Sequence, residues 1–385
     1  MTVKTKKSRT ETSASFRERY IGWFEKWMPE SFVICLTLTL AVAGLAFFVT
    51  DTPVWTNNSE QVSLVSAWAD SFWNLLAFTM QMTVLLASGS AVASSPPAQR
   101  LMSWIGSIPK TRSQALILGS VVSGALGYIH WGLGMMAAIV LGKEILAQSR
   151  KRGLGIHPPV MVAVLFMAFL TSSSGISGAA VLYSATPGYL RDLVPESYKE
   201  MTPETIGLTE SVLRIDFILF LVLCLAVTIV FAILMHPKRA EEIGQIDESV
   251  IEEYESSQQE IKISRGTPAE KANASRWIMY LIGGLGLIYS VNILVRDGIG
   301  ALNLNTFNFL FISLGMVLCA NYGPEFYAGL IRKGIDGTWG FILQFPFYAG
   351  IFGLISATGL GEVLTHFFTS ISTPTTWPVS YTHLT

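Results

Sequence analysis

Long apolar segments alternate with short polar segments along most of the chain. The apolar segments that read as membrane spans are 32–49, 72–93, 213–234, 277–295, 305–320 and 339–358. Each approaches the roughly 20 apolar residues that a helix needs to cross a bilayer. Two further apolar regions, 113–146 and 158–190, are interrupted by glycine, serine and histidine. The pattern predicts an all-α polytopic membrane protein with broken helices.

The first interrupted region, 113–146, has basic residues on both sides. Arg112 precedes it, and the run 150–152 (Arg-Lys-Arg) follows it. Because positive charge favours the cytoplasmic side, the region starts and ends on the same side. A re-entrant hairpin with residues 129–132 at its tip fits this pattern as well as two short spans do.

The second interrupted region contains the serine stretch, residues 171–180 (Thr-Ser-Ser-Ser-Gly-Ile-Ser-Gly-Ala-Ala). Irregular backbone is tolerated at membrane depth only inside protein or beside a wet cavity. Serine favours helix starts, so the stretch predicts a broken helix with a new N-terminus directed into the protein. Such an end suits a carboxylate, although a packing face of small residues is the alternative. The candidate substrate-binding residues are Ser172, Ser173, Ser174, Gly175, Ser177 and Gly178.

Composition supports a membrane class. The chain is 51% hydrophobic and 14% charged, with a net charge of −1, whereas soluble domains carry about 25% charged residues. The expected partner is therefore the lipid bilayer, and no nucleic acid is expected. The three cysteines lie in apolar segments without metal-ligand spacing, so we expect neither a metal nor a cofactor.

The distribution of lysine and arginine predicts the topology. The N-terminus is basic, while the loop 51–69 has no Lys or Arg. The positive-inside rule places the N-terminus and residues 240–275 in the cytoplasm and 51–69 outside. Residues 15–27 mix basic and aromatic side chains, which is typical of a helix lying in the membrane interface.

An internal repeat relates residues 73–91 to 339–357 at a constant offset of 266. The charge bias gives the two copies opposite directions, and inverted repeats with interrupted helices are typical of secondary transporters. No second serine stretch follows the second copy, so we expect the second repeat to be incomplete. The predicted parts are a tail with the interfacial helix (1–28), the first repeat (29–237), a cytoplasmic linker (238–275), a connecting span with the start of the second repeat (276–378), and a non-native tail (379–385).

Amide side chains in the second copy are further candidates for substrate binding. Asn305 and Asn308 lie one turn apart on one helix face, where they serve either helix–helix hydrogen bonds or a ligand. Gln344 precedes Pro346, which frees a backbone carbonyl near Ile342. That carbonyl either binds a cation or is satisfied by a neighbouring helix. Tyr348 is a candidate to receive an apolar substrate tail.

The residues that bear on ion coupling are fewer. His130 is placed either to relay a proton or as a satisfied interior histidine. Weaker candidates are Gln81, Pro346, Ser356 and Thr358. No predicted span has a central acid, and Glu144 lies near the end of its predicted segment. Sodium bound by hairpin oxygens, and a proton carried by a weak acid, both stay open.

Two runs in the second copy, 304–311 (Leu-Asn-Thr-Phe-Asn-Phe-Leu-Phe) and 339–351, accompany Ser172-Ser173-Ser174-Gly175. Together they resemble the bacterial short-chain fatty acid transporter family over residues 15–378. The resemblance implies ion-coupled symport of monocarboxylates such as acetoacetate or butyrate across the bacterial inner membrane. Family members continue further at the C-terminus, so we expect this chain to lack one or two spans.

Several other functions compete with this one. The nearest alternative is a carrier for another small carboxylate, such as a dicarboxylate. A membrane-embedded hydrolase would need Ser174 as nucleophile within hydrogen-bond reach of His130, and we expect no enzyme. A passive channel and a homo-oligomeric assembly stay open.

Overall fold

The computed structural model describes residues 20, 22–23, 26–58, 61–172, 174–192, 194, 199–237 and 266–371. Within these residues the secondary structure is helical. The helices up to the serine stretch are α2 (Ser31–Thr50), α3 (Leu64–Ser71), α4 (Leu76–Ala93), α5 (Pro96–Ser107), α6 (Arg112–Ile129), α7 (Trp131–Arg152) and α8 (Pro158–Ser172). The later helices are α9 (Ala179–Ser184), α10 (Tyr189–Asp192), α12 (Ile215–Met235), α14 (Pro268–Asn273), α15 (Arg276–Asp297), α16 (Leu304–Cys319), α17 (Pro324–Asp336), α18 (Trp339–Ala357) and α19 (Leu360–Ile371).

Among the described residues, six helical segments are long and apolar enough to cross a membrane. They are α2, α4, α12, the segment Pro268–Asp297, the segment Leu304–Tyr322, and α18. The six predicted spans are confirmed, and the protein is an all-α, multi-pass membrane protein. The helices differ in burial. In α4, 67% of the most apolar 18-residue stretch is buried, whereas in α12 only 6% of the corresponding stretch is buried. Helix α4 is therefore an interior helix, while α12 leaves most of its surface for lipid.

The chain forms two compact units. Unit 1 comprises Met1–Leu75 and Leu343–Thr385, and unit 2 comprises Leu76–Ile342. Helix α18 begins in unit 2 and continues into unit 1. The predicted repeats, 29–237 and 276–378, do not coincide with these two units. The division into repeats stays a prediction.

In unit 1, α2, α3 and α18 pack around a small apolar core that includes Ala46, Leu64 and Leu354. The ring of Phe347 on α18 meets the ring of Phe32 on α2 with centroids 5.3 Å apart. Along the chain, Phe32 precedes the core residue Ala46 on α2, and Phe347 precedes the core residue Leu354 on α18. Helices α2 and α18 therefore run in the same direction.

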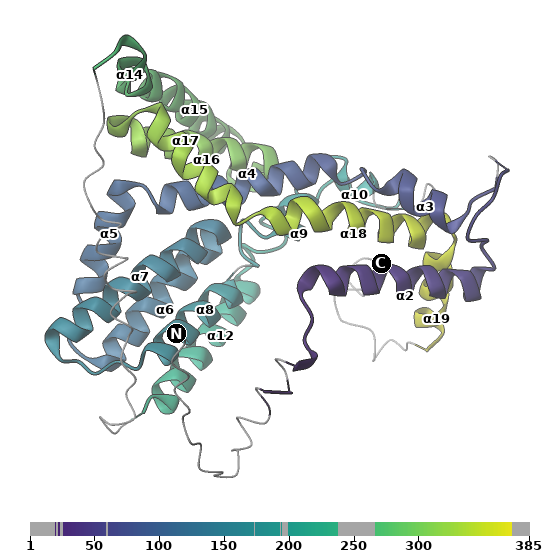
Figure 1. The fold of residues 1–385 in the computed structure, drawn as a ribbon, viewed down its shortest axis with the longest axis horizontal. Helices are drawn as coiled ribbons and strands as arrows, with labels where there is room; N and C mark the ends of the chain where they lie inside the picture. The colour runs from purple at the N-terminus through teal and green to yellow at the C-terminus, as the bar shows by residue number, and fades with distance from the viewer. Residues whose placement is uncertain are drawn as a thin grey trace, which may run out of the picture. The chain divides into compact units, whose positions relative to one another are not determined.

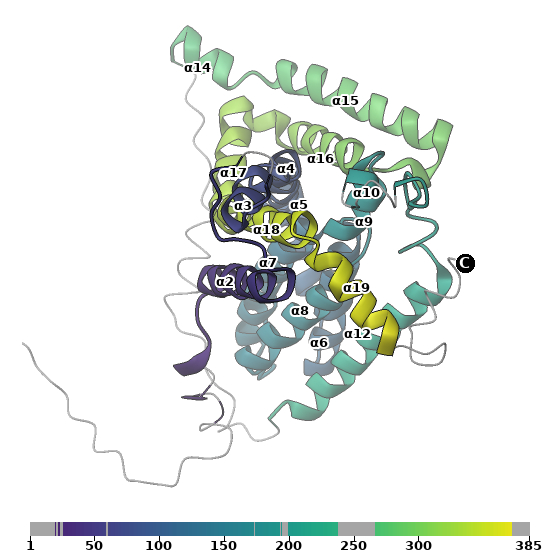
Figure 2. The ribbon, with the colours of Figure 1, turned by 90° about the vertical axis from the view of Figure 1, so that its right-hand side faces the viewer.

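Unit 2 is built on a bundle of α6, α7, α8 and α12, in which each helix packs against at least one other (Figure 1). Its core includes Leu116, Leu141, Ile145, Met161 and Leu165. Helix α4 packs against α7, α16 and α17, and α15 lies along α16 (Figure 2).

Both interrupted regions contain helix breaks. Helix α8 ends at Ser172 and α9 begins at Ala179, which confirms the break predicted in the serine stretch. Helices α6 and α7 pack against each other and meet at His130, so the region 113–146 folds into a helical hairpin with His130 at its tip. Helix α7 continues to Arg152, and Glu144 is consequently a buried residue in its interior. The placement of Glu144 near a segment end was wrong because the polar last turns of α7 stay helical.

Several predicted segments lie wholly or mostly outside the described residues. They are the interfacial helix at 15–27, most of the linker 238–275, and the tail 379–385. The part of the linker that is described contains α14, whose N-cap Thr267 forms a capping box with Glu270.

Candidate functional site

The two helix breaks of unit 2 are joined by two hydrogen bonds. The amide of Ile176 donates to the carbonyl of Tyr128 at 2.8 Å. In return, the amide of Trp131 donates to the hydroxyl of Ser177 at 2.6 Å. A Cβ at position 175 would collide with the carbonyl oxygen of Tyr128, so Gly175 permits this close approach. Backbone groups left free by each break are thereby satisfied by the other.

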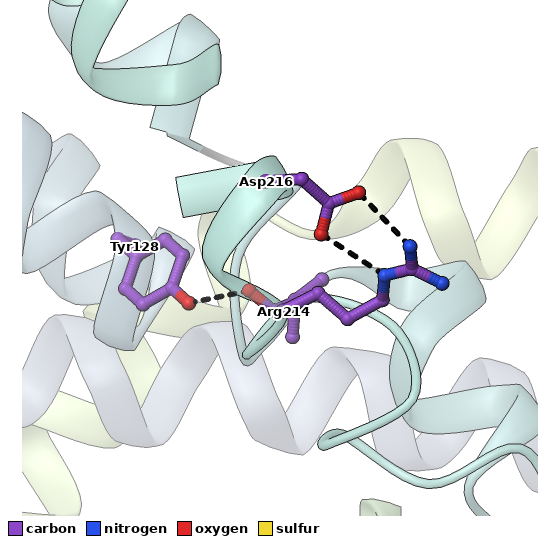
Figure 3. Close-up of polar contacts among 4 residues, drawn as sticks. Tyr128, Arg214 and Asp216 are labelled. Atoms are coloured by element: carbon purple, nitrogen blue, oxygen red, sulfur yellow. Dashed lines mark hydrogen bonds and ion pairs between the residues drawn. The ribbon is translucent and has the colours of Figure 1, made fainter. Parts of the chain in front are cut away.

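Tyr128 also connects the hairpin tip to the segment before α12. Its hydroxyl donates to the carbonyl of Val212 at 2.8 Å (Figure 3). Two residues further along, Arg214 and Asp216 form an exposed ion pair at 3.0 Å at the start of α12. The α6–α7 tip therefore has bonds to the serine stretch on one side and to the α12 entry on the other.

His130 is fully buried at the hairpin tip and caps α7 with its ring. Its Nδ1 accepts hydrogen bonds from the amides of Gly132 and Leu133, at 3.2 and 3.4 Å. The ring packs on Phe311 with centroids 4.1 Å apart. A Cβ at position 89 would collide with the imidazole, so Gly89 makes room for it on α4. Among the described residues, only the Nδ1 of this histidine has hydrogen-bond partners. The buried Nε2 has none within the described part of the chain.

An amide cluster joins α4 to the start of α16 within unit 2. The Nε2 of Gln81 donates to the Oδ1 of Asn305, and the hydroxyl of Tyr189 donates to the Oε1 of Gln81 at 3.1 Å. The Nδ2 of Asn308 donates to the backbone carbonyl of Gln81 at 3.0 Å. The sequence predicted a shared face for Asn305 and Asn308, and the structure brings both to Gln81.

The segment after the serine stretch reaches the same end of α16. The hydroxyl of Thr186 accepts from the amide of Leu304 at 3.3 Å, and Asn303 caps α16 with its side chain. The broken helix and the amide cluster therefore belong to one continuous region of unit 2.

A second glutamine site lies in unit 1. The Nε2 of Gln344 donates to the hydroxyl of Ser31 at 2.8 Å, and its Oε1 accepts from the hydroxyl of Tyr348 at 3.3 Å. Pro346 is buried within α18, which continues as one helix through it. The two glutamine sites share a pattern, because each glutamine donates to the first turn of one helix and accepts from a tyrosine.

The residues of the serine stretch differ in their surroundings. Ser173 and the side chain of Ser172 lie outside the part of the chain that the structure describes. Ser174 is exposed, whereas Gly175, Ser177 and Gly178 are buried. Helix α9 has only six residues, and the amide of Ile176 is already bonded to Tyr128. The start of α9 therefore has fewer free backbone amides than the start of a long helix would have. The role of these amides in substrate binding stays a prediction.

Two weaker candidates, Ser356 and Thr358, bond to carbonyls of α18. The hydroxyl of Thr358 donates to Leu354 at 2.6 Å and that of Ser356 to Gly353 at 3.5 Å. Thr358 precedes Gly359, whose positive φ of 77° lets the chain turn from α18 into α19.

The hydrolase arrangement has no support in the geometry. Within the residues that the structure describes, no hydrogen bond joins Ser174 to His130, and the Nδ1 of His130 serves the α7 amides instead. The same residues contain no group of three or more His, Cys, Asp or Glu that could bind a metal ion.

Sequence reasoning missed Tyr128, Tyr189, Gly89 and the phenylalanines that cover His130. A glycine inside the apolar span of α4 was a usable signal for close approach at Gly89. No comparable signal marks Tyr189, because its partner Gln81 lies more than a hundred residues away along the chain.

Comparison with known proteins gives the family. The sequence matches the family described as "Short chain fatty acid transporter" over residues 15–384. It is 30% identical to the "Putative short-chain fatty acid transporter" of Escherichia coli (strain K12), over 94% of this chain and 77% of that protein. A Haemophilus influenzae protein of the same description (strain ATCC 51907 / DSM 11121 / KW20 / Rd) is also 30% identical, over 92% of this chain and 75% of its own length. No solved structure matches. The chain belongs to the short-chain fatty acid transporter family, and it is a membrane transport protein rather than an enzyme.

Proposed function

We propose that this protein carries short-chain monocarboxylates such as acetoacetate and butyrate across the bacterial inner membrane by ion-coupled alternating access. The observation that carries the proposal is the contact between two helix breaks inside a multi-pass protein, through Trp131 and Ser177. Discontinuous helices at the interior of a membrane transporter are where substrate and ion sites usually form.

The substrate site is proposed at this junction and the adjoining amide cluster. Candidate contacts are Ser174 and Gly178 on the serine stretch, and Asn305 and Asn308 on α16. Aromatic rings at the same end of the region, such as Phe307 beside His130 at 5.5 Å between centroids, offer an apolar surface for a short tail. One polar group and a short tail are what a small monocarboxylate presents.

A monocarboxylate fits this region better than a dicarboxylate. Helices α4 and α16 contain no Lys, Arg, Asp or Glu in their sequences. A second carboxylate bound there would be buried without a cationic partner, which is strongly unfavourable.

An inverted repeat is part of the proposal. Helices α2–α5 are, in order, a span, an amphipathic helix, a second span and a second amphipathic helix. The same order recurs in α16–α19. The pairings recur as well, because α4 packs on α16 and α17 in unit 2, while α18 meets α2 and α3 in unit 1 through Ser31 and Trp68. Gln81 on α4 and Gln344 on α18 lie at similar positions in their helices, although Gln344 is three residues out of the 266-residue register. The charge bias supplies the opposite directions.

The coupling ion and the arrangement in the membrane also belong to the proposal. Sodium and a proton are the two candidate coupling ions, and a cytoplasmic N-terminus follows from the distribution of basic residues. A homo-oligomer is compatible with the large apolar surface of helices such as α12.

Uptake by purified protein in liposomes tests the proposal. Saturable accumulation of labelled acetoacetate or butyrate against a concentration gradient, above that in protein-free liposomes, is the expected result. Competition by the other monocarboxylate but not by succinate would support the substrate class. Linear uptake without saturation would identify a channel, and preferred uptake of succinate would overturn the monocarboxylate assignment.

A further inference from the structure

Three buried side-chain atoms in unit 2 have no hydrogen-bond partner within the described residues. They are the Nε2 of His130, the Nε1 of Trp131 and the Oδ1 of Asn308. Of these three residues, His130 and Asn308 are more than nine-tenths buried, at 0% and 7% exposure. An unsatisfied buried polar group is destabilising, so two such side chains together call for an explanation.

The chemical identity of each atom follows from its neighbours. The Nδ1 of His130 accepts from two backbone amides, so it carries no proton, and in the neutral ring the proton is on Nε2. The backbone carbonyls of Leu85 and of His130 itself interact with the imidazole, but neither meets the geometry of a hydrogen bond to Nε2. The carbonyl of Leu85 accepts from the hydroxyl of Ser88 at 3.0 Å. His130 therefore presents an unused donor.

Asn308 presents an unused acceptor. Its Nδ2 donates to the carbonyl of Gln81 at 3.0 Å. That bond fixes which end of the amide is nitrogen, because an oxygen cannot donate to a carbonyl. The Oδ1 must therefore be the atom without a partner.

The donor and the acceptor belong to the same seam between α4 and α16. Asn308 bonds to Gln81 on α4, and the imidazole meets Leu85 and Gly89, one and two turns further along. On α16, Asn308 is adjacent in sequence to Phe307 and one turn before Phe311, the two residues whose rings cover the imidazole.

We propose that this seam binds the carboxyl group of the substrate in its neutral, protonated form. The Nε2–H of His130 donates to the carbonyl oxygen of the acid, and the acid O–H donates to the Oδ1 of Asn308. This inference rests on the proposed function and names the form in which the substrate is carried. Opening of the seam during alternating access admits the acid.

A carboxylate and a sodium ion each fit this donor and acceptor less well. A carboxylate has no proton to give to Asn308, and its charge would be buried between helices that lack any cationic residue. A sodium ion at the Oδ1 of Asn308 would leave the N–H donor of His130 without an acceptor. A neutral acid satisfies both atoms at once.

The proton then travels on the substrate. A carboxylate and one proton from solution combine before binding, and both leave together on the other side, so the cycle moves no net charge. A carboxyl group with an ordinary pKa of about 4.3 is about one part in 500 neutral at pH 7. The neutral fraction changes about tenfold for each pH unit above that pKa.

Binding to the purified full chain tests the inference without the background of passive diffusion. The apparent Kd for total butyrate is expected to rise about tenfold for each pH unit between pH 6 and pH 8. Butyramide is the matched probe, because it has the same carbonyl acceptor and an N–H donor but does not ionise. It is expected to compete with butyrate and to bind equally at all these pH values.

Two variants test whether His130 and Asn308 form the binding site. Asn308→Leu removes the acceptor, and His130→Asn keeps an α7 cap while withdrawing the Nε2 donor. Each is expected to weaken binding of butyramide at least tenfold. Ser290→Ala, which removes a buried hydroxyl bonded to Gly286 on α15, is the control for general effects of polar deletion and should leave binding unchanged.

The outcomes separate the inference from the function on which it rests. A Kd for butyrate that is constant with pH, together with no competition by butyramide, would show that the carboxylate binds and would overturn the inference. Unchanged binding in both seam variants, or a bound water alone between His130 and Asn308 in a butyrate complex, would overturn it too. If wild-type protein neither binds nor takes up any short-chain acid at any pH, the proposed function itself fails.

Discussion

Ser177 accepts a hydrogen bond of 2.6 Å from the backbone amide of Trp131, so a residue of the serine stretch completes the start of α7. The two residues belong to different helix breaks and are both in unit 2. Each break exposes backbone groups that lipid could not satisfy. Their contact explains how two interruptions persist in one membrane protein.

Removing this bond should destabilise the junction. Ser177→Ala leaves the amide of Trp131 without its partner in a buried place, which costs about 1–3 kcal/mol. We expect a lower melting temperature in detergent and slower uptake. Ser184→Ala is the matched control, because within the described residues the Ser184 hydroxyl bonds only to carbonyls of its own helix. Equal melting temperatures for the two variants would show that the contact contributes little.

Adding one methyl group at Gly175 should be more damaging than its size suggests. The Cβ of Gly175→Ala would collide with the carbonyl oxygen and ring of Tyr128, so the two breaks would be forced apart. Uptake is expected to fall at least tenfold, and Gly175→Val should abolish it. Gly284→Ala provides the control, since nothing lies within 4 Å of a Cβ there. Normal transport by Gly175→Ala would mean that the junction is not part of the transport site.

The two glutamine sites should respond alike if they are equivalent halves of a repeat. Tyr189→Phe and Tyr348→Phe each remove one hydroxyl that donates to a glutamine Oε1. A hydrogen bond of this kind contributes about 0.5–1.5 kcal/mol, so the KM for uptake should rise about two- to tenfold in both. Tyr280→Phe removes an exposed hydroxyl bonded to Asn321 and should have no effect. A change in only one of the two variants would argue against equivalence of the sites.

The topology can be tested at Asn57, an exposed residue of the loop between α2 and α3. In a chain whose three native cysteines are replaced, Asn57→Cys should react with a membrane-impermeant thiol reagent added outside the cell. The reason is the lack of Lys and Arg in residues 51–69. Labelling only after the cytoplasmic side is opened would reverse the predicted orientation of the whole protein.

The sequence predicted the spans because hydrophobic length is a local property. The apolar segments of α2, α12 and α18 each identify a membrane helix without knowledge of any neighbour. The break at Ser172–Ala179 was also predictable, since glycine and serine alter backbone preferences where they stand. The bounds of α4 were less accurate, because residues 72–75 form a turn after α3 that hydropathy does not distinguish from the helix.

Only the tertiary structure decided which polar groups meet. The sequence singled out Gln81, Asn305, Asn308 and His130 separately, but their partners depend on how α4 packs against α16. The pairing of Gln81 with Tyr189, the use of His130 as the cap of α7, and the free atoms of His130 and Asn308 all follow from that packing. Such contacts join positions far apart along the chain, so hydropathy and local propensity determine the helices, and side-chain packing between the helices determines the site.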